Sequence, residues 1–278
     1  NTMPPKASFI PYKNEEEITE RKSSLRVSLD GLWKFAYAKN LMLAVKDFYK
    51  KDYCVKSWDS ISVPSNMQME GYDIPQYANV QYPWDGVQDV AHYEIPSDFN
   101  PVGLYVKMLN ISEKAENKDI IITFEGVESA FALFVNGEYV GYAADSFTAS
   151  SFDLTKFVQT GLNKIAVMVF KWTIGSWCED QDFFRLSGIY RSVYVDVLPR
   201  TRMDDFTLKA IPDEEFKNGN LSVEVLLQGR GKLVTELSYK GETILTDEKE
   251  ISEKVSLNLD VEGVRLWNAE KPELYDLI

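Results

Sequence analysis

The stretch SAFALFVNGEYVGY, residues 129–142, decides the fold class. Its first half, Ser129–Val135, is apolar on both alternating faces, which is typical of a strand covered on both sides. Asn136-Gly137 follows directly, and Glu138–Tyr142 is again strand-like. Asn-Gly between two such runs is the strongest short signal for a β-hairpin. The stretch therefore predicts a hairpin within a buried sheet.

The same period of two extends in both directions from this hairpin. Asp119–Gly126 and Ile165–Phe170 are apolar on both faces, and Val193–Val197 alternates as a half-buried strand does. Leu41–Lys50 predicts a short helix, and no long amphipathic helix follows anywhere. Because no repeating unit of strand and helix is present, a parallel α/β sheet is disfavoured. The first 200 residues or so therefore predict an all-β sandwich.

A second β region follows Pro199 and the charged stretch Arg200–Asp205, which resembles a linker. Apolar residues alternate in three runs, Leu221–Leu227, Leu233–Tyr239 and Val255–Val261. Short strands at this spacing are typical of an immunoglobulin-like sandwich, which needs about seven strands in ~100 residues. Residues 200–278 are too few for a complete domain of this kind, and the pattern of Glu273–Ile278 predicts an apolar strand. We therefore expect this second sandwich to be incomplete at its C-terminus.

Composition excludes several classes of function. The chain has 30 basic and 43 acidic residues and a formal net charge of −13. A protein that binds phosphate backbones needs clustered Lys and Arg, so neither nucleic acid nor an anionic membrane is expected as a partner. His92 is the only histidine, which rules out histidine-rich metal sites. Cys54 and Cys178 cannot form a disulfide framework.

The sequence also bears on location. Ile165–Phe170, the longest clean apolar run, is much too short to span a bilayer. No secretory signal opens the chain, which favours a cytoplasmic location. Removal of a signal peptide from a longer precursor is the alternative.

Two segments interrupt the β pattern and concentrate aromatic and polar side chains. They are Gly71–Asp85, GYDIPQYANVQYPWD, and Lys171–Arg191, KWTIGSWCEDQDFFRLSGIYR. A pyranose offers one apolar face and a rim of hydroxyls, so aromatic rings beside carboxylates and amides suit a carbohydrate site. The carboxylates of Glu179, Asp180 and Asp182 could also hold a hard cation. The competing interpretation is that the aromatic residues belong to the core and the acidic loop is solvated.

Seven stretches, in this order along the chain, resemble the N-terminal part of the large β-galactosidases of glycoside hydrolase family 2. They are Leu29–Phe35, Val63–Met69, Tyr77–Pro83, Phe124–Val127, Phe152–Leu154, Glu179–Arg191 and Leu266–Tyr275. The related β-glucuronidases share the Asp-Phe-Phe and Gly-Ile-x-Arg elements. The galactosidase branch fits better, because it has the Asn-Val-x-Tyr-Pro segment and Arg at the position of Arg185.

The resemblance implies a jelly-roll sugar-binding domain with an N-terminal arm, residues 1–199, and an immunoglobulin-like domain, residues 200–278. A TIM barrel with the active site follows in the family and has no counterpart in this sequence. Family members are retaining glycosidases whose two catalytic Glu residues, ~5 Å apart, both lie in that barrel. This chain is therefore expected to be a non-catalytic fragment of a β-galactosidase. Asn14-Glu15 matches the family's acid/base dipeptide but is expected to be a solvated charge cluster.

The resemblance also implies site residues. Asn79 and Asp182 correspond to family residues that reach into the barrel's active site and bind the galactosyl group. Asp182 would also help to hold a sodium ion, whereas magnesium would bind in the barrel. Arg185 and Arg191 are expected to pair with the acidic loop. Glu179 and Asp180 receive no role. Trp84 stands where an aliphatic residue is usual, so the rim around Asn79 is expected to differ.

Two alternatives remain open. The chain could be an autonomous carbohydrate-binding module or lectin, or part of a family enzyme that acts on a glucuronide or a mannoside. The expected partners are a β-galactoside and the catalytic barrel of the same full-length chain, with a homo-oligomer formed at full length. His92 is expected to be a loop residue rather than a ligand.

Overall fold

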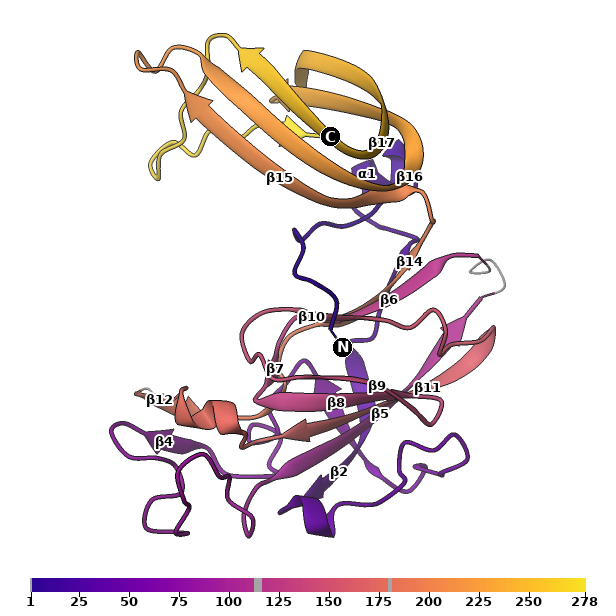
Figure 1. Cartoon of the computed structure of the whole chain (residues 1–278), viewed down its shortest axis with the longest axis vertical. Coiled ribbons are helices and arrows are strands. Elements are labelled where there is room, and N and C mark those ends of the chain that lie inside the picture. The colour runs from indigo at the N-terminus through magenta and orange to yellow at the C-terminus, as the bar shows by residue number, and fades with distance from the viewer. Residues whose placement is uncertain (1, 113–116, 180–181) are drawn as a thin grey trace. The chain divides into compact units, whose positions relative to one another are not determined.

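The computed structural model describes residues 2–112, 117–179 and 182–278 and is built almost entirely of β-strands (Figure 1). It divides into two compact units. The first contains the residues up to Pro5 together with Ile10–Leu198, and the second contains Lys6–Phe9 together with Pro199–Ile278. None of the helices in the described ranges is long and apolar enough to cross a bilayer.

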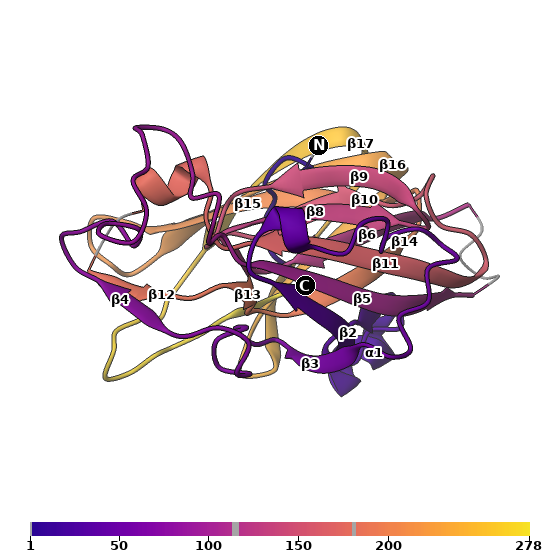
Figure 2. The ribbon, with the colours of Figure 1, turned by 90° about the horizontal axis from the view of Figure 1, so that it is seen from below.

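Two antiparallel sheets form the first unit (Figure 2). The larger has six strands in the order β3-β2-β5-β11-β8-β9: Asp59–Val63, Gly31–Ala38, Val102–Ile111, Gly161–Phe170, Ala130–Val135 and Glu138–Ala143. The smaller has four in the order β1-β14-β6-β10: Arg26–Ser28, Val193–Leu198, Asp119–Phe124 and Ser150–Asp153. Two short ladders, β4 (Gln76–Ala78) with β12 (Phe183–Arg185) and β7 (Val127–Glu128) with β13 (Gly188–Ile189), complete the unit.

The core lies between these two sheets. Phe35 and Tyr105 come from the larger sheet and Phe124 from the smaller one, and their exposed fractions are 0–1%. The Phe35 and Tyr105 rings lie 4.9 Å apart at 65°, a favourable edge-on arrangement. The sheets are therefore the two layers of a β-sandwich, as the alternating sequence predicts.

The predicted hairpin is confirmed. β8 pairs with β9, and Asn136 and Gly137 in the turn have φ angles of 52° and 95°. Two consecutive positive φ angles are the mark of the tight turn that Asn-Gly favours, because its twist matches that of the strands. Phe131 faces the core, whereas Phe134 on the opposite face stacks on Tyr49 at 4.4 Å. Both faces of β8 are therefore covered, as its sequence predicts.

The helix expected over Leu41–Lys50 is wrong except for one turn. Leu41–Leu43 forms a 3-10 helix, designated η1, whose first residue follows Asn40; the Asn40 side chain accepts a hydrogen bond from the Leu43 amide. The rest of the segment folds as turns. Phe48 is fully buried and packs with Trp58 against the outer face of the larger sheet. Burial of these rings, rather than a helical period, decides the local structure.

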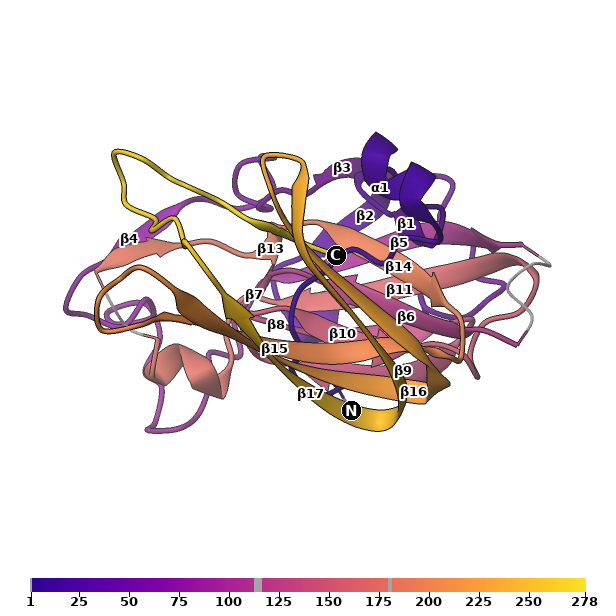
Figure 3. The same cartoon turned by 90° about the horizontal axis from the view of Figure 1, so that it is seen from above.

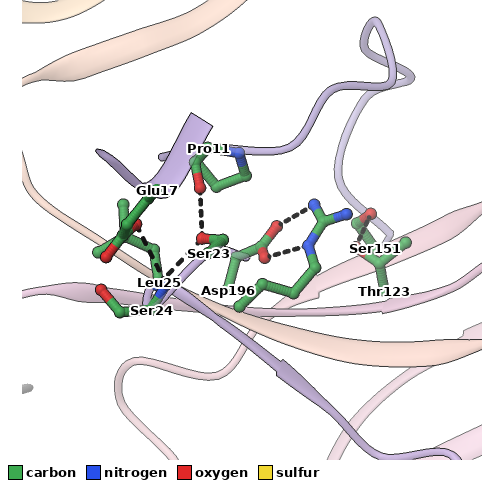
Figure 4. A network of polar contacts seen from close by, with 9 residues as sticks. Pro11, Glu17, Ser23, Ser24, Leu25, Thr123, Ser151 and Asp196 are labelled. Carbon is green, nitrogen blue, oxygen red and sulfur yellow. Dashed lines mark hydrogen bonds and ion pairs between the residues drawn. The ribbon is translucent and has the colours of Figure 1, made fainter. Parts of the chain in front are cut away.

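A network of polar contacts lies around the start of β1 (Figure 4). Helix α1, Glu15–Glu20, begins after Asn14, whose side chain accepts a hydrogen bond from the Glu17 amide. Arg26 then donates two hydrogen bonds to Asp196 of β14, at 2.7 and 2.8 Å. Such a bidentate pair is stronger and more directional than a single ionic contact.

In the second unit, β15 (Arg202–Pro212), β16 (Gly219–Tyr239) and β17 (Glu242–Val261) form an antiparallel sheet, and β18 (Asp276–Leu277) pairs with β16 (Figure 3). The predicted runs 221–227 and 233–239 belong to one strand, β16, with an irregularity between Leu226 and Arg230. The Lys240-Gly241 turn joins β16 to β17 with φ angles of 50° and 82°. An apolar groove of about 410 Å³, lined in part by Leu208 and Trp267, lies in this unit.

Candidate functional site

The two aromatic and acidic segments meet in the short ladder between β4 and β12. Tyr77 lies opposite Phe184, and Ala78 lies opposite Phe183. The chains run in opposite directions in an antiparallel pair, so the residue after β4 lies opposite the residue before β12. These two residues are Asn79 and Asp182. The ladder thus brings together the two site residues that the sequence analysis names.

Tyr77, Asn79 and Asp182 form a cluster that we call the polar edge. The Tyr77 hydroxyl donates a hydrogen bond to Oδ1 of Asp182, 105 positions along the chain. This hydrogen bond raises the pKa of Tyr77; partial desolvation and the negative charge of Asp182 add to the effect, whereas a hydrogen bond with the Asn79 side chain opposes it. Tyr77 of β4 is therefore linked directly to one of the two predicted site residues, Asp182.

Aromatic rings beside the polar edge fall into two groups. Tyr77 and Phe184 are 55% and 57% exposed, and their ring centroids lie 5.6 Å apart. They can therefore offer faces to a ligand. Trp84 and Trp172, by contrast, are each 4% exposed and pack edge-to-face. These two tryptophans are core residues, which is the interpretation that the sequence left open for this group.

Further aromatic contacts support the loop that follows Asn79. The rings of Tyr82 and Trp84 are stacked, with centroids 5.5 Å apart, and Trp177 packs against both. Trp177 lies on the 3-10 helix η3, Ile174–Trp177, and its indole donates to the Glu94 carbonyl at 2.6 Å. His92 is exposed in a turn of the same loop, and its ring lies 5.6 Å from that of Trp177. The loop between β4 and β5 is thus packed on η3.

A buried ion pair lies close to β4 along the chain and was not recognised from the sequence. Lys171 Nζ lies 2.5 Å from Oδ2 of Asp73, and the two side chains are 0% and 3% exposed. Gln68 donates to the same Asp73 oxygen at 2.8 Å and to the Ser187 hydroxyl at 2.9 Å. The pair links residue 73, just before β4, to residue 171, just after β11. The only signal in the sequence is a lysine directly after the apolar run Ile165–Phe170.

A second charged group surrounds Glu128 at the end of β7. Burial raises the pKa of Glu128 to about 7; the nearby charge of Glu179 adds to this rise, and Arg185 and Lys171 oppose it. Burial likewise raises the pKa of Glu179, whose Oε1 accepts a contact from the Ser146 hydroxyl at 3.4 Å. The sequence assigns no role to Glu179. In the structure it forms a partly buried pair of carboxyl groups with Glu128.

Arg185 and Arg191, for which the sequence predicts structural roles, have different surroundings. Arg185 is 3% exposed, its guanidinium lies 4.5 Å from the Phe183 ring, and its positive charge acts on both Glu128 and Glu179. Arg191 is exposed and donates to the Phe147 carbonyl at 2.9 Å. Asp180, for which the sequence analysis has no role, lies outside the described residues.

The remaining candidates from the sequence have ordinary structural positions. Asn14 caps α1 and Glu15 begins that helix, so this dipeptide is a capping element. Cys54 and Cys178 are free and exposed. Within the described ranges, no group of three or more His, Cys, Asp or Glu side chains is arranged to hold a metal ion.

Comparison with known proteins identifies the family of this chain. The family model described as "Glycosyl hydrolases family 2, sugar binding domain" matches residues 26–199, and the model "Glycosyl hydrolases family 2" matches residues 201–278. Among curated relatives, β-galactosidases from Clostridium acetobutylicum and Halalkalibacterium halodurans are each 40% identical, over 96% and 100% of this chain. A β-galactosidase large subunit from Lactobacillus helveticus is 38% identical over the whole chain.

The chain spans 30%, 28% and 47% of the lengths of these three relatives, respectively. Solved structures show the same fold. A β-glycosidase from Bacteroides vulgatus has a TM-score of 0.70 at 24% identity, with 91% of this chain and 31% of that one aligned. A β-glucuronidase from Ruminococcus gnavus has a TM-score of 0.69 at 18% identity, covering 98% of this chain and 44% of that one. With its sugar-binding domain matched over residues 26–199, the chain belongs to glycosyl hydrolase family 2.

Proposed function

We propose that this chain is the substrate-binding, non-catalytic N-terminal part of a retaining β-galactosidase that removes terminal β-D-galactosyl residues. One observation carries the proposal: Asn79 and Asp182, 103 positions apart in sequence, lie side by side at the end of the β4–β12 ladder, where the Tyr77 hydroxyl donates to Asp182 beside exposed aromatic rings. An amide and a carboxylate suit sugar hydroxyls, and an exposed ring suits the apolar face of a pyranose. Relatives of 38–40% identity are β-galactosidases, which supports galactose as the sugar.

The chemistry would be done by a part of the protein that this chain does not contain. Retaining hydrolysis needs one Glu as acid/base and one as nucleophile, ~5 Å apart. We assign both to a TIM barrel of the longer protein. Asn79 and Asp182 would form one wall of the site, bind the galactosyl hydroxyls and orient the sugar toward those groups. Phe184 would contribute an apolar surface at the rim.

Sodium is the cation proposed for the polar edge. Asp182 is exposed, and its carboxylate oxygens are the hard ligands that such a cation prefers. The bound ion would have a coordination position that the oxygen of a sugar hydroxyl can occupy weakly. Asp182 would neutralise part of its charge, and the barrel would provide the other ligands. Magnesium would bind within the barrel alone. We further propose a homo-oligomeric, cytoplasmic enzyme.

The test uses the longer protein expressed from the open reading frame that encodes this sequence. Asp182→Asn keeps the size of the side chain but loses its charge and replaces an acceptor by a donor. A hydrogen bond to a charged group contributes about 1.5–3 kcal/mol. We therefore expect kcat/KM for an aryl β-galactoside to fall roughly ten- to a hundredfold. The dependence of activity on sodium should weaken as well.

Asp89→Asn is the matched control, since Asp89 is an exposed aspartate of the loop after β4. Equal losses in the two variants would mean that only the surface charge matters and would reject the role of Asp182. Aryl β-glucuronide and β-mannoside substrates test the choice of sugar. The isolated 278-residue chain should hydrolyse none of the three substrates, and turnover by it would contradict the non-catalytic assignment.

A further inference from the structure

We propose that Tyr77 is a positioning residue that orients Asp182, beside Asn79, so that the free carboxylate oxygen of Asp182 accepts a hydrogen bond from a sugar hydroxyl. The inference rests on the proposed function and deepens it, because it says how the polar edge would recognise its substrate. Tyr77 acts through Asp182.

The chemistry of the Tyr77–Asp182 contact fixes its donor and its acceptor. An ionised carboxylate can only accept, so the single proton of the Tyr77 hydroxyl goes to Oδ1 of Asp182. This leaves the second Asp182 oxygen as an acceptor for a ligand, beside the exposed side chain of Asn79 at the end of β4.

The Tyr77 side chain is itself held in place. Its backbone lies in the middle of β4, directly opposite Phe184 of β12. The two rings are in contact, with centroids 5.6 Å apart and planes at 61°. Asp182 and Asn79, by contrast, lie just outside the ladder and are exposed. In the ranges that the structure describes, the Asp182 carboxylate is held by the hydrogen bond from the Tyr77 hydroxyl.

Fixing the Asp182 side chain before the ligand arrives has a direct consequence for binding. An exposed Asp samples several rotamers, and ordering it on binding costs free energy. Tyr77 removes that cost and holds the free carboxylate oxygen in one position. An acceptor held in one position selects a ligand with a suitably placed hydroxyl donor, which is the chemistry of a galactosyl group.

Tyr77→Phe tests the proposal in the longer protein, because it removes the hydroxyl and keeps the ring against Phe184. We expect kcat/KM for an aryl β-galactoside to fall about tenfold while the melting temperature of the protein stays unchanged. Tyr93→Phe is the matched control; it removes a hydroxyl from a tyrosine that is 77% exposed, and it should leave kcat/KM unchanged. A loss with Tyr77→Phe no larger than with Tyr93→Phe would overturn the inference.

A double-mutant cycle separates positioning from a merely structural role. If Tyr77 acts through Asp182, adding Tyr77→Phe to Asp182→Asn should lower kcat/KM by less than threefold further. Full additivity of the two losses would overturn the inference. If Asp182→Asn alone has no effect, the proposed binding role of Asp182 fails first, together with the inference that depends on it.

A measurement on the 278-residue chain keeps the two failures apart. Three-bond NMR couplings across χ1 of Asp182 should report one dominant rotamer in the parent and in Tyr93→Phe, and averaged rotamers in Tyr77→Phe. Identical couplings in all three proteins would show that Tyr77 does not orient Asp182, whatever the enzyme hydrolyses. Averaging in Tyr77→Phe together with an unaffected kcat/KM would reject the link between this orientation and binding.

Discussion

The ammonium group of Lys171 lies 2.5 Å from a carboxylate oxygen of Asp73, and both side chains are shielded almost completely from water. Asp73 precedes β4 and Lys171 follows β11, so the contact joins two segments that are distant in sequence. Removing charges from water is costly, and their attraction offsets that cost only while both partners are present. This pair therefore supports the position of the segment that carries Tyr77 and Asn79.

Breaking this pair should destabilise the first unit strongly. Asp73→Asn leaves a buried ammonium group without its counter-charge, and we expect the free energy of unfolding to fall by about 3–5 kcal/mol. Urea denaturation measures this loss. Glu215→Gln is the control: it breaks the Lys217–Glu215 pair, whose side chains are both 72% exposed, and should cost about 0–1 kcal/mol. Losses of equal size would show that the buried pair contributes no more than a surface one.

Glu128 should make the stability of the first unit fall as the pH rises. Its folded-state pKa is raised from 4.5 to about 7, so the folded protein holds a proton that the unfolded chain has already lost between these values. Stability is then fully present below pH 4.5 and is lost as the pH rises to about 7, by roughly 1–3 kcal/mol. Urea denaturation at pH 4.5 and pH 8 measures this contribution.

Glu128→Gln should remove this part of the pH dependence, because the amide does not titrate. Glu138→Gln, at an exposed position of β9, should retain it. An unchanged difference between pH 4.5 and pH 8 in Glu128→Gln would mean that another group causes the loss of stability.

Gly188 should tolerate no side chain. Its φ is +135°, and an added Cβ would lie 2.8 Å from the Ser65 carbonyl oxygen and 3.1 Å from the Met67 amide nitrogen. Because both are backbone atoms, neither can move aside cheaply, and Gly188→Ala should cost about 3 kcal/mol or more in unfolding free energy.

Gly86→Ala separates backbone strain from steric clash. Gly86 has a φ of +74° but no heavy atom within 4 Å of the added Cβ. Its replacement should cost only about 1 kcal/mol, measured by thermal or urea unfolding. A Gly188→Ala variant as stable as Gly86→Ala would show that the backbone around residues 65–67 can shift.

The isolated chain should bind galactose only weakly. Asn79 and Asp182 are both exposed and form an open edge, so their polar groups are well solvated without a ligand. Calorimetric titration should give a dissociation constant of about 1 mM or weaker for galactose. A micromolar constant would instead favour an autonomous carbohydrate-binding module or lectin.

Asn79 and Asp182 of the polar edge are site candidates from the resemblance to family 2, and their binding role stays a prediction. The register of β4 and β12 sets them beside one another. Tyr77 stands two residues before Asn79 in Gly71–Asp85, and the resemblance assigns it no role. Its importance depends on a hydroxyl that reaches across to β12, and no local pattern in the sequence indicates which residue lies there.

The sequence by itself determined the features that depend on near neighbours. The apolar run Ser129–Val135 and the Asn136-Gly137 turn predicted the β8–β9 hairpin, because strand patterning and turn geometry are local properties. Only the tertiary structure decided which distant segments pair. β4 and β12 meet through long-range packing, Phe48 is buried on a sheet face instead of in a helix, and burial sets the charge state of Glu128. Each of these depends on what the rest of the chain places nearby, which periodicity cannot encode.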